Sequence, residues 1–419
     1  MNVTKTQQLQ LAFEQAKNTT PILNDMPEFA PTGDYSYIRP VWFDGMNKED
    51  KKTKVFAYIG FPENASAEAP VPAIVLIHGG GGHAFLPWVK MWNARGYAAI
   101  AMDNTGYFPT TVNAGDNEAC KNWAFGLPEQ LQAPDYTDAP NNDDLTSSAN
   151  DDVSTMWMYH AVGQTILCVN ILRADSRVDS NKIGITGISW GGMITSITMG
   201  YDDRLAFAIP VYCTGYSTHN PWGGMKERFS RDNGTQELWA PEHRYDKVTM
   251  PVLWLCWNDD NGMSVQNNSL SYLDGIKNNP EDRLSIKHMM FHSHGCTWYA
   301  DECTAYADSI VMGAPKLTAI TSHTVGRSIS LTLTPDPSAT DITATVFYLT
   351  KPITHSKFKK YHYDPWHEFL EEYWNTAPLT VCGNEVTGNV PADALSYYVE
   401  IKTTINGKQY VTSSVYTDL

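Results

Sequence analysis

One segment decides the fold: Lys182-Ile183-Gly184-Ile185-Thr186-Gly187-Ile188-Ser189-Trp190-Gly191-Gly192. Its first half is an apolar run of strand length, and residues 193–199 beyond it have a helical composition. Between strand and helix, glycines stand two positions before and two positions after Ser189. Larger side chains there would clash in the sharp turn that lifts the serine hydroxyl clear of a sheet. This context predicts that Ser189 is a nucleophile, the alternative being a purely structural turn.

Apolar runs of the same kind flank this segment from residue 52 to about residue 312. Most are nearly continuous in Val, Ile, Leu and aromatic residues, which is typical of strands buried on both faces. The best helical pattern covers residues 154–174, where apolar residues recur every three or four positions. Strands alternating with helices predict an α/β fold with a doubly wound, mostly parallel sheet. The candidate strands are residues 53–59, 72–78, 97–103, 182–188, 207–212, 251–258 and 285–291.

The pattern changes near residue 322, where short alternating strands continue without helices between them. Asn406-Gly407 marks a hairpin turn among them. We therefore expect a catalytic domain over residues 1–321, with an N-terminal arm over about 1–50, and an immunoglobulin-like β-sandwich over 322–419. The irregular segment 104–152 is either a lid or a surface excursion. The expected C-terminal strands are residues 328–334, 342–350, 379–382, 395–403 and 409–416.

Composition excludes several classes of protein. Among 419 residues, 30 Lys and Arg stand against 46 Asp and Glu, a net charge of −16, which argues against a nucleic-acid partner. No apolar run reaches the ~20 residues of a membrane span, and the first residues lack a signal sequence. We expect a cytoplasmic protein, or a periplasmic or secreted one if a signal peptide was removed. Seven cysteines, an odd number, fit reduced thiols, and no zinc spacing occurs, so we expect neither metal nor cofactor.

A nucleophilic serine needs an imidazole base and a carboxylate that orients the base. In this kind of fold they follow the serine in the order acid, then histidine, on loops after later strands. The strand at 251–258 is followed by Asp259 and Asp260, and the strand at 285–291 by His292 and His294. We prefer Asp259, the first carboxylate beyond its strand, and His294, whose neighbour Gly295 gives the backbone freedom to turn. Asp260 and His292 remain open.

A glycine-rich loop follows the strand at 72–78 and supplies the next element of the site. It reads His78-Gly79-Gly80-Gly81-Gly82, and its backbone N–H groups can stabilise an oxyanion. We expect Gly80 or Gly81 to act together with the N–H of Trp190. A phosphate loop is excluded because Gly-Lys-Ser or Gly-Lys-Thr is missing here. Nearby tryptophans either line an acyl or sugar pocket or simply pack; they are Trp92, Trp123, Trp190, Trp257 and Trp298.

These motifs resemble the α/β-hydrolase superfamily over roughly residues 50–312, and more narrowly bacterial acetylxylan-esterase and dienelactone-hydrolase-like proteins. The resemblance implies a serine carboxylesterase that releases acetyl or other short acyl groups from esters such as acetylated xylan or oligosaccharides. Ser189 would be the nucleophile, His294 the base and Asp259 its orienting partner. Dienelactone hydrolases have a cysteine where this chain has Ser189, which favours ester hydrolysis over lactone opening.

The expected partner is therefore a small-molecule or oligosaccharide ester, with no nucleic acid and no membrane, and a homo-oligomer is left open. Two other functions compete with this prediction. A serine peptidase of the prolyl-oligopeptidase type shares the serine turn and the order of the triad, although nothing here repeats at the ~40 to 50 residue period of its propeller. A non-catalytic glycan-binding protein would use the C-terminal sandwich instead.

Overall fold

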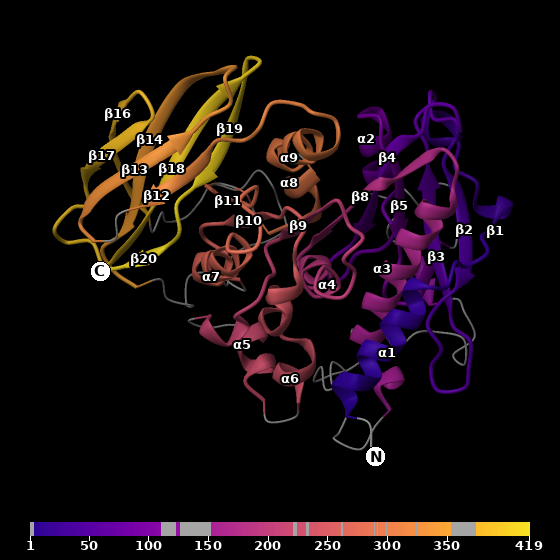
Figure 1. Cartoon of the computed structure of the whole chain (residues 1–419). Helices are drawn as coiled ribbons and strands as arrows, with labels where there is room; N and C mark the ends of the chain where they lie inside the picture. Colours follow the sequence, from indigo (N-terminus) through magenta and orange to yellow (C-terminus); the bar gives the residue numbers. More distant parts are fainter. Residues whose placement is uncertain are drawn as a thin grey trace. The chain divides into compact units, whose positions relative to one another are not determined.

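A computed structural model describes residues 4–109, 123–125, 152–220, 224–231, 234–260, 263–288, 290, 292–298, 300–323, 326–352 and 374–419. The chain forms two compact units (Figure 1). The first comprises Met1–Cys213 and Arg228–Met250, and the second comprises Thr214–Glu227 and Pro251–Leu419. This division differs from the expected boundary at 321/322, because the strands that carry the candidate acid and base belong with the C-terminal strands. Most of the suggested lid, 110–122 and 126–151, lies outside the described residues.

The first unit is built on a mixed sheet with the strand order β1-β2-β3-β5-β4-β8-β9. Strands β5, β4, β8 and β9 are parallel, whereas β1, β2, β3 and β5 pair antiparallel in turn. All residues of β5 and β9 are buried, as their continuous apolar sequences predict. The strands are β1 (Asn24–Asp25), β2 (Arg39–Asp44), β3 (Lys54–Gly60), β4 (Val71–Ile77), β5 (Ala98–Met102), β8 (Val178–Ile188) and β9 (Phe207–Val211).

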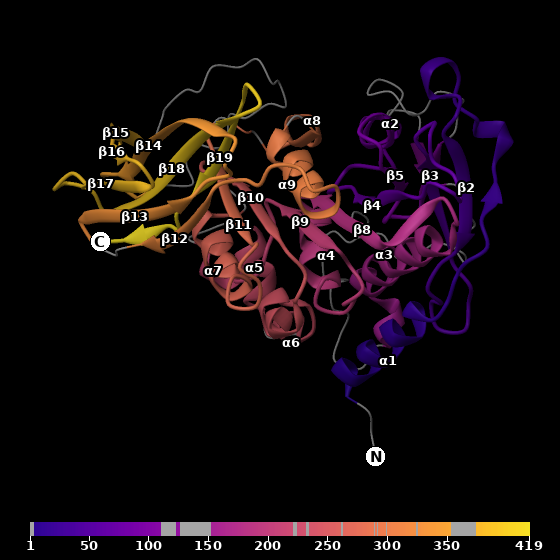
Figure 2. The same cartoon turned by 45° about the horizontal axis from the view of Figure 1, so that its top comes forward.

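Helices cover both faces of this sheet. Figure 2 shows α2 (Leu86–Ala94) on one face and α3 (Trp157–Ala174) on the other, with α1 (Lys5–Lys17) outside α3. Residues 157–172 of α3 are all buried, because α1 covers the side that faces away from the sheet. Asn170 on α3 donates to the carbonyl oxygen of Ala16 on α1 at 2.7 Å. The remaining elements of this unit are β6 (Tyr107–Pro109), β7 (Trp123–Phe125), α4 (Trp190–Thr198) and α6 (Thr235–Trp239), while α5 (Gly224–Phe229) spans the chain position where the units change.

The second unit contains a parallel pair of strands, β10 (Leu253–Trp257) and β11 (Arg283–Lys287). Three helices belong with them: α7 (Val265–Gly275), α8 (His294–Trp298) and α9 (Asp301–Val311). The predicted strands at 251–258 and 285–291 are confirmed as strands, but β11 ends at Lys287. Several residues therefore separate the end of β11 from His292 and His294, which allows the chain to turn between them.

The C-terminal β region, strands β12 to β20, contains two antiparallel sheets. One has the order β12-β13-β17-β16, and the other has the order β15-β14-β18-β19 with β20 beside β18. Both sheets contribute to one buried apolar cluster, which includes Leu331, Val346, Val386 and Val399. The strands are β12 (Ala319–His323), β13 (Ser328–Thr334), β14 (Ala339–Leu349), β15 (Asn375–Pro378), β16 (Thr380–Cys382), β17 (Glu385–Asn389), β18 (Ser396–Ile405), β19 (Lys408–Ser413) and β20 (Thr417–Asp418).

The predicted hairpin at Asn406-Gly407 joins β18 to β19. Both residues have positive φ angles, 53° and 76°, and Ile405 pairs with Lys408 across the turn. A two-residue hairpin with positive φ at both positions favours this dipeptide. The pattern missed β1, β2, β6, β7, β12, β15, β17 and β20, because these strands lack the continuous apolar run by which the five-residue strands β5, β9 and β10 were recognised.

The C-terminal β region is tied to β11 and α9 by polar contacts within the second unit. The N–H of Ile286 on β11 donates to Ser413 Oγ on β19 at 3.0 Å. The buried Glu302 on α9 accepts from the Val411 N–H at 2.9 Å and pairs with Lys287 at 2.6 Å. Edge-strand groups that would otherwise lack partners are satisfied by these side chains. The C-terminal strands and the candidate acid and base strands are thus one packed body.

Candidate active site

Ser189 occupies a strained turn between β8 and α4 in the first unit. Its φ is 58° and its ψ is −118°, a conformation that costs a non-glycine residue about 1–3 kcal/mol. Its N–H donates to the Val211 carbonyl oxygen at 3.0 Å, and its carbonyl oxygen accepts from the Met193 N–H at 3.0 Å. Ser189 is half-buried among fully buried neighbours. The predicted strand, sharp turn and helix are confirmed, and the strain is of the kind found at functional residues.

Close backbone contacts explain the glycines around Ser189. A Cβ at Gly187 would lie 2.1 Å from the Gly191 carbonyl oxygen, and one at Gly192 would lie 2.3 Å from the Val211 carbonyl oxygen. A Cβ at Gly191 would lie 2.0 Å from the carbonyl oxygen of Ile77, the last residue of β4. Contacts this short exclude any side chain. They also bring the start of α4 against the end of β4, where the glycine-rich loop begins.

The glycine-rich loop leaves β4 through a tight turn. The Gly82 N–H donates to the Gly79 carbonyl oxygen at 3.0 Å, and Gly81 has a φ of +68°. Gly80 is half-buried and Gly81 is exposed, so this predicted pair forms the tip of the turn. Positive φ at the third turn position is the glycine geometry of a type II turn. Because Gly191 packs on Ile77, the loop and the backbone of Trp190 belong to one local assembly, as an oxyanion site requires.

His78, at the base of this loop, is hydrogen-bonded to Asn104. Asn104 was not among the residues expected from the sequence. The Asn104 N–H donates to His78 Nε2 at 3.0 Å, and its side-chain amide donates to the His78 carbonyl oxygen at 3.0 Å. Trp157 in turn donates its indole N–H to the Asn104 carbonyl oxygen at 2.7 Å. These bonds make Nε2 an acceptor, which places the proton of neutral His78 on Nδ1. The network fixes the strand end from which the glycine turn departs.

The second unit holds an acid–base pair, formed by the buried Asp260 and the partly exposed His292. His292 Nδ1 lies 2.6 Å from Asp260 Oδ2, and the other carboxylate oxygen, Oδ1, accepts from the Met263 N–H at 3.0 Å. The Asp260 side chain is 0% exposed, whereas that of His292 is 32% exposed. The carboxylate is thus fixed on both oxygens, and the imidazole keeps a face to solvent. An orienting acid and a general base would be related in the same way.

The acid–base pair seen in the structure is not the one preferred from the sequence. Asp259 and His294 were preferred there, but the ion pair joins Asp260 and His292, the other member of each pair. Asp259 is the third residue of a turn closed by a 3.2 Å bond from the Asp260 N–H to the Trp257 carbonyl oxygen, and His294 is the first residue of α8. The turn places the paired carboxylate one position beyond the first carboxylate after the strand, which counting from the strand end could not reveal.

The pKa of His292 reflects two opposing effects. Burial of the imidazole lowers the pKa, and the charge of Asp260 together with the hydrogen bond to it raises the pKa. The effect of Asp260 is the stronger overall, so the pKa of His292 lies above its ordinary value. A raised pKa makes this imidazole a better proton acceptor, as a general base requires.

The predicted pocket tryptophans lie in different surroundings. Trp92 on α2 is 1% exposed and packs edge-on against Tyr97, which is the burial of a core residue. Trp257 is the buried last residue of β10, and Trp298 is the half-buried last residue of α8. The Trp190 ring meets Trp157 edge-on at 5.4 Å and has the Arg228 guanidinium 5.2 Å above it. The side chain of Trp123 lies outside the described residues.

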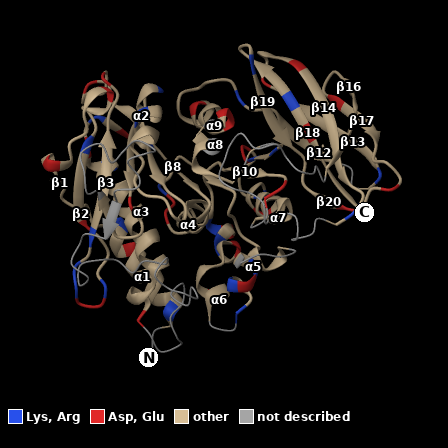
Figure 3. Ribbon diagram, turned by 180° about the vertical axis from the view of Figure 1, so that it is seen from behind, with Lys and Arg blue, Asp and Glu red and all other residues tan. Residues whose placement is uncertain are grey.

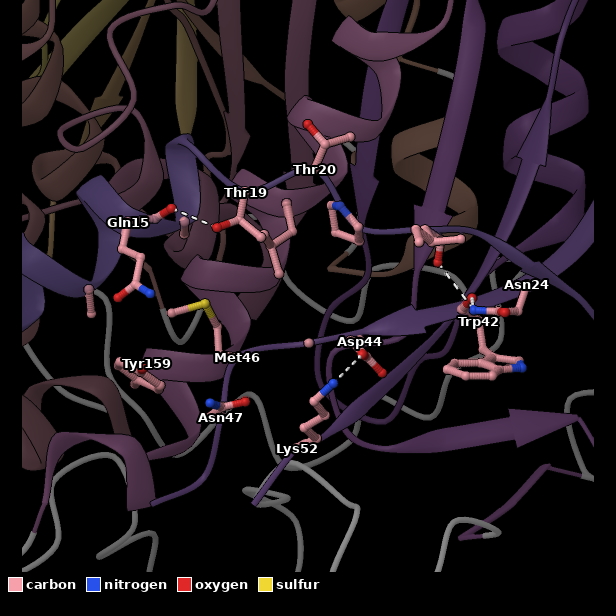
Figure 4. A pocket seen from close by; sticks show the side chains of 16 residues that line it. Gln15, Thr19, Thr20, Asn24, Trp42, Asp44, Met46, Asn47, Lys52 and Tyr159 are labelled. Atoms are coloured by element: carbon pink, nitrogen blue, oxygen red, sulfur yellow. Dashed lines mark hydrogen bonds and ion pairs between the residues drawn. The ribbon is translucent and has the colours of Figure 1, made fainter. Parts of the chain in front are cut away.

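A separate pocket of about 550 Å³ opens beside α1 and β2 (Figure 4). Its wall includes Met46, Tyr159 and the Asp44–Lys52 ion pair. The lining contains none of the predicted site residues, so this pocket is not the predicted active site. Across the described ranges, no three His, Cys, Asp or Glu side chains gather as metal ligands would. In the same ranges, none of the helices has the length and apolar character needed to cross a bilayer.

Comparison with known proteins identifies the fold. No family model matches the chain, and no curated protein sequence matches it. The solved structure of an acetyl xylan esterase from Paenibacillus sp. R4 is similar with a TM-score of 0.50 and 15% identity, covering 74% of this chain and 96% of that one. This likeness, the parallel strands and the strained serine turn define an α/β-hydrolase-type fold.

Two further solved structures are similar with lower TM-scores. An acetyl xylan esterase from Thermoanaerobacterium sp. JW/SL YS485 has a TM-score of 0.43 at 15% identity, over 68% of this chain and 88% of that one. An acylaminoacyl peptidase from Pyrococcus horikoshii has a TM-score of 0.44 at 14% identity, over 66% of this chain and 42% of that one.

Proposed function

We propose that this protein is a serine hydrolase that cleaves carboxylic esters, with Ser189 as nucleophile, His292 as general base and Asp260 as the residue that orients His292. Asp260 and His292 take the roles that the sequence analysis gave to Asp259 and His294. The observation that carries the proposal is the 2.6 Å bond between a fully buried carboxylate and a partly exposed imidazole. The strained conformation of Ser189 supports the same conclusion.

The proposed reaction proceeds through an acyl-enzyme. Ser189 Oγ attacks the ester carbonyl carbon while His292 Nε2 accepts the hydroxyl proton, and Asp260 stabilises the imidazolium that forms. Backbone N–H groups of Trp190 and of Gly80 or Gly81 stabilise the tetrahedral oxyanion. The alcohol leaves with the proton from His292. A water molecule, activated by the same imidazole, then attacks the acyl group and releases the carboxylic acid and free Ser189.

The proposed substrate is a short acyl ester, with acetyl groups on a neutral carbohydrate such as xylan or an oligosaccharide as the first candidate. The Paenibacillus protein of similar fold carries the name acetyl xylan esterase, which motivates this choice. Acidic and basic residues are interspersed along the described chain (Figure 3), and a neutral sugar ester does not require a field of one sign. The half-buried Trp298 is the proposed pocket aromatic of the second unit, and the C-terminal sheets are proposed to be an immunoglobulin-like sandwich.

The test is hydrolysis of p-nitrophenyl esters from acetate to octanoate by the wild-type chain and by Ser189→Ala. We expect kcat/KM to fall beyond acetate and Ser189→Ala to lose at least 10³-fold in kcat. An acetylated xylo-oligosaccharide should compete with p-nitrophenyl acetate and release acetate, whereas the deacetylated sugar should do neither. Full activity in Ser189→Ala would overturn the proposed nucleophile.

The two competing functions give different outcomes in the same assay. A peptidase would cleave acylated aminoacyl p-nitroanilides faster, per kcat/KM, than any ester of the series. A glycan-binding protein would bind the xylo-oligosaccharide, as measured by calorimetry, without turnover of any ester. Either result would refute the esterase proposal.

A further inference from the structure

Asp260, which is hydrogen-bonded to His292, is the last residue of a four-residue turn. Residues 257–260 leave β10, and the Asp260 N–H closes the turn on the Trp257 carbonyl oxygen at 3.2 Å. Asn258, the second residue, donates its N–H to the carbonyl oxygen of Lys287, the last residue of β11, at 3.0 Å. The orientation of the peptide group between Asn258 and Asp259 determines the type of this turn. The orientation of this peptide group therefore determines the direction in which Asp260 points out of the turn.

That peptide group is held from the C-terminal β region. Trp374, just before β15, donates its indole N–H to the Asn258 carbonyl oxygen at 3.0 Å. The Asn258 side-chain amide donates to the Tyr398 hydroxyl on β18 at 3.2 Å and lies 3.3 Å from His288 Nδ1. Asn258 is 3% exposed, so these bonds form away from water. The turn is thus fixed through both its backbone and its side chain.

The indole donor of Trp374 and the hydroxyl acceptor of Tyr398 are themselves held rigidly. The ring of Phe347 on β14 stacks on Tyr398 at 5.1 Å with an angle of 10°, and Trp374 meets Tyr398 edge-on at 5.0 Å. Phe347 also lies 5.5 Å from the ring of His288, which follows β11. Phe347, Trp374 and Tyr398 are 5%, 3% and 0% exposed. Close packing of large rings leaves little freedom for the indole N–H and the phenol hydroxyl.

Strand β18 explains why these contacts form. Tyr397 and Tyr398 are consecutive and point to opposite faces of the strand. Tyr397 joins the apolar cluster between the two C-terminal sheets, and its hydroxyl lies 3.4 Å from His323 Nε2. Tyr398 faces the turn at 257–260 instead. Both tyrosines are fully buried, so the strand has one face in the C-terminal core and one face on the acid-bearing turn.

We propose that Trp374 and Tyr398 are positioning residues of the active site, and that the C-terminal β region sets the Asp260–His292 geometry through Asn258. The inference rests on the proposed function of that pair. It assigns the C-terminal β region a positioning part in catalysis, in place of a separable accessory role. Neither residue touches the reacting atoms; each acts through the turn.

The test compares three conservative variants. Trp374→Phe removes the indole N–H donor, and Tyr398→Phe removes the hydroxyl acceptor. The matched control is Tyr397→Phe, which removes the hydroxyl of the neighbouring tyrosine, also 0% exposed, on the other face of β18. We expect the first two to lower kcat for p-nitrophenyl acetate about threefold to tenfold with KM within twofold, because one hydrogen bond is lost in each. Tyr397→Phe should leave kcat unchanged. Thermal unfolding of all three should separate this effect from general destabilisation.

A second readout does not depend on activity. The titration of His292, followed by NMR in histidine-labelled protein and assigned with His292→Gln, should move to lower pH in Trp374→Phe and Tyr398→Phe, because a displaced Asp260 stabilises the imidazolium less. Tyr397→Phe should titrate like the wild type. Equal kcat and equal titration in all three variants would overturn the inference, even if Ser189→Ala confirms the esterase. Undiminished activity in Ser189→Ala would refute the esterase proposal itself, whatever the titration shows.

Discussion

Replacing Asp260 by Asn is the sharpest test of the proposed acid–base pair. The Met263 N–H, 3.0 Å from Oδ1, requires an oxygen at that position, so the Asn amide nitrogen would take the place of Oδ2. The amide would then present an N–H to His292 Nδ1, at a site where the distance is 2.6 Å in the wild type. Two donors cannot face each other, so the imidazole would carry its proton on Nε2. That nitrogen could no longer accept the proton of Ser189.

The expected loss follows from this change of tautomer. We expect kcat for p-nitrophenyl acetate to fall about 10³- to 10⁴-fold, which corresponds to about 4–5.5 kcal/mol of transition-state stabilisation. Asp259→Asn is the matched control, since Asp259 is the adjacent buried carboxylate of the same turn, and it should lose less than tenfold. Circular dichroism and thermal unfolding check that both variants fold. If Asp259→Asn lost the larger factor, or if Asp260→Asn kept more than a tenth of kcat, the assignment would be wrong.

Three further expectations concern stability and pH. Gly191→Ala, whose Cβ would meet a backbone carbonyl oxygen at 2.0 Å, should lower the free energy of unfolding in urea by about 3 kcal/mol or more, whereas Gly81→Ala, with open space around it, should cost only about 1–2 kcal/mol for its positive φ. Burial raises the pKa of Asp282 to about 7, so the folded state binds a proton that the unfolded state releases near pH 4. The free energy of unfolding should therefore fall as pH rises from about 4 to 7. Asp282→Asn should flatten that slope in urea titrations. Asp260 outweighs the effect of burial and raises the pKa of His292, so the pair's contribution to stability should be present below pH ~6.5 and lost as pH rises through the folded pKa. For the same reason, the acid limb of the kcat/KM profile should lie above pH ~6.5 in the wild type and below that value in Asp260→Asn.

Local patterns in the sequence were sufficient to predict several parts of the fold. Continuous apolar runs identified the buried parallel strands, because a strand covered on both faces needs apolar residues at every position. The serine turn was recognisable because steric exclusion around Ser189 tolerates only glycine at fixed offsets. The hairpin at Asn406-Gly407 was equally local, since two consecutive positive φ angles favour that dipeptide.

The tertiary structure alone decided which carboxylate and which imidazole meet. Asp259 and Asp260 are chemically identical neighbours, and one hydrogen bond across the turn at 257–260 directs Asp260 toward His292. The contacts that hold this turn come from Trp374 and Tyr398, more than 110 residues further along the chain. No pattern of local periodicity encodes a contact between a strand-end turn and a distant strand. Side-chain direction at the site is therefore a product of packing, whereas the strands and the serine turn follow from the backbone preferences of the residues themselves.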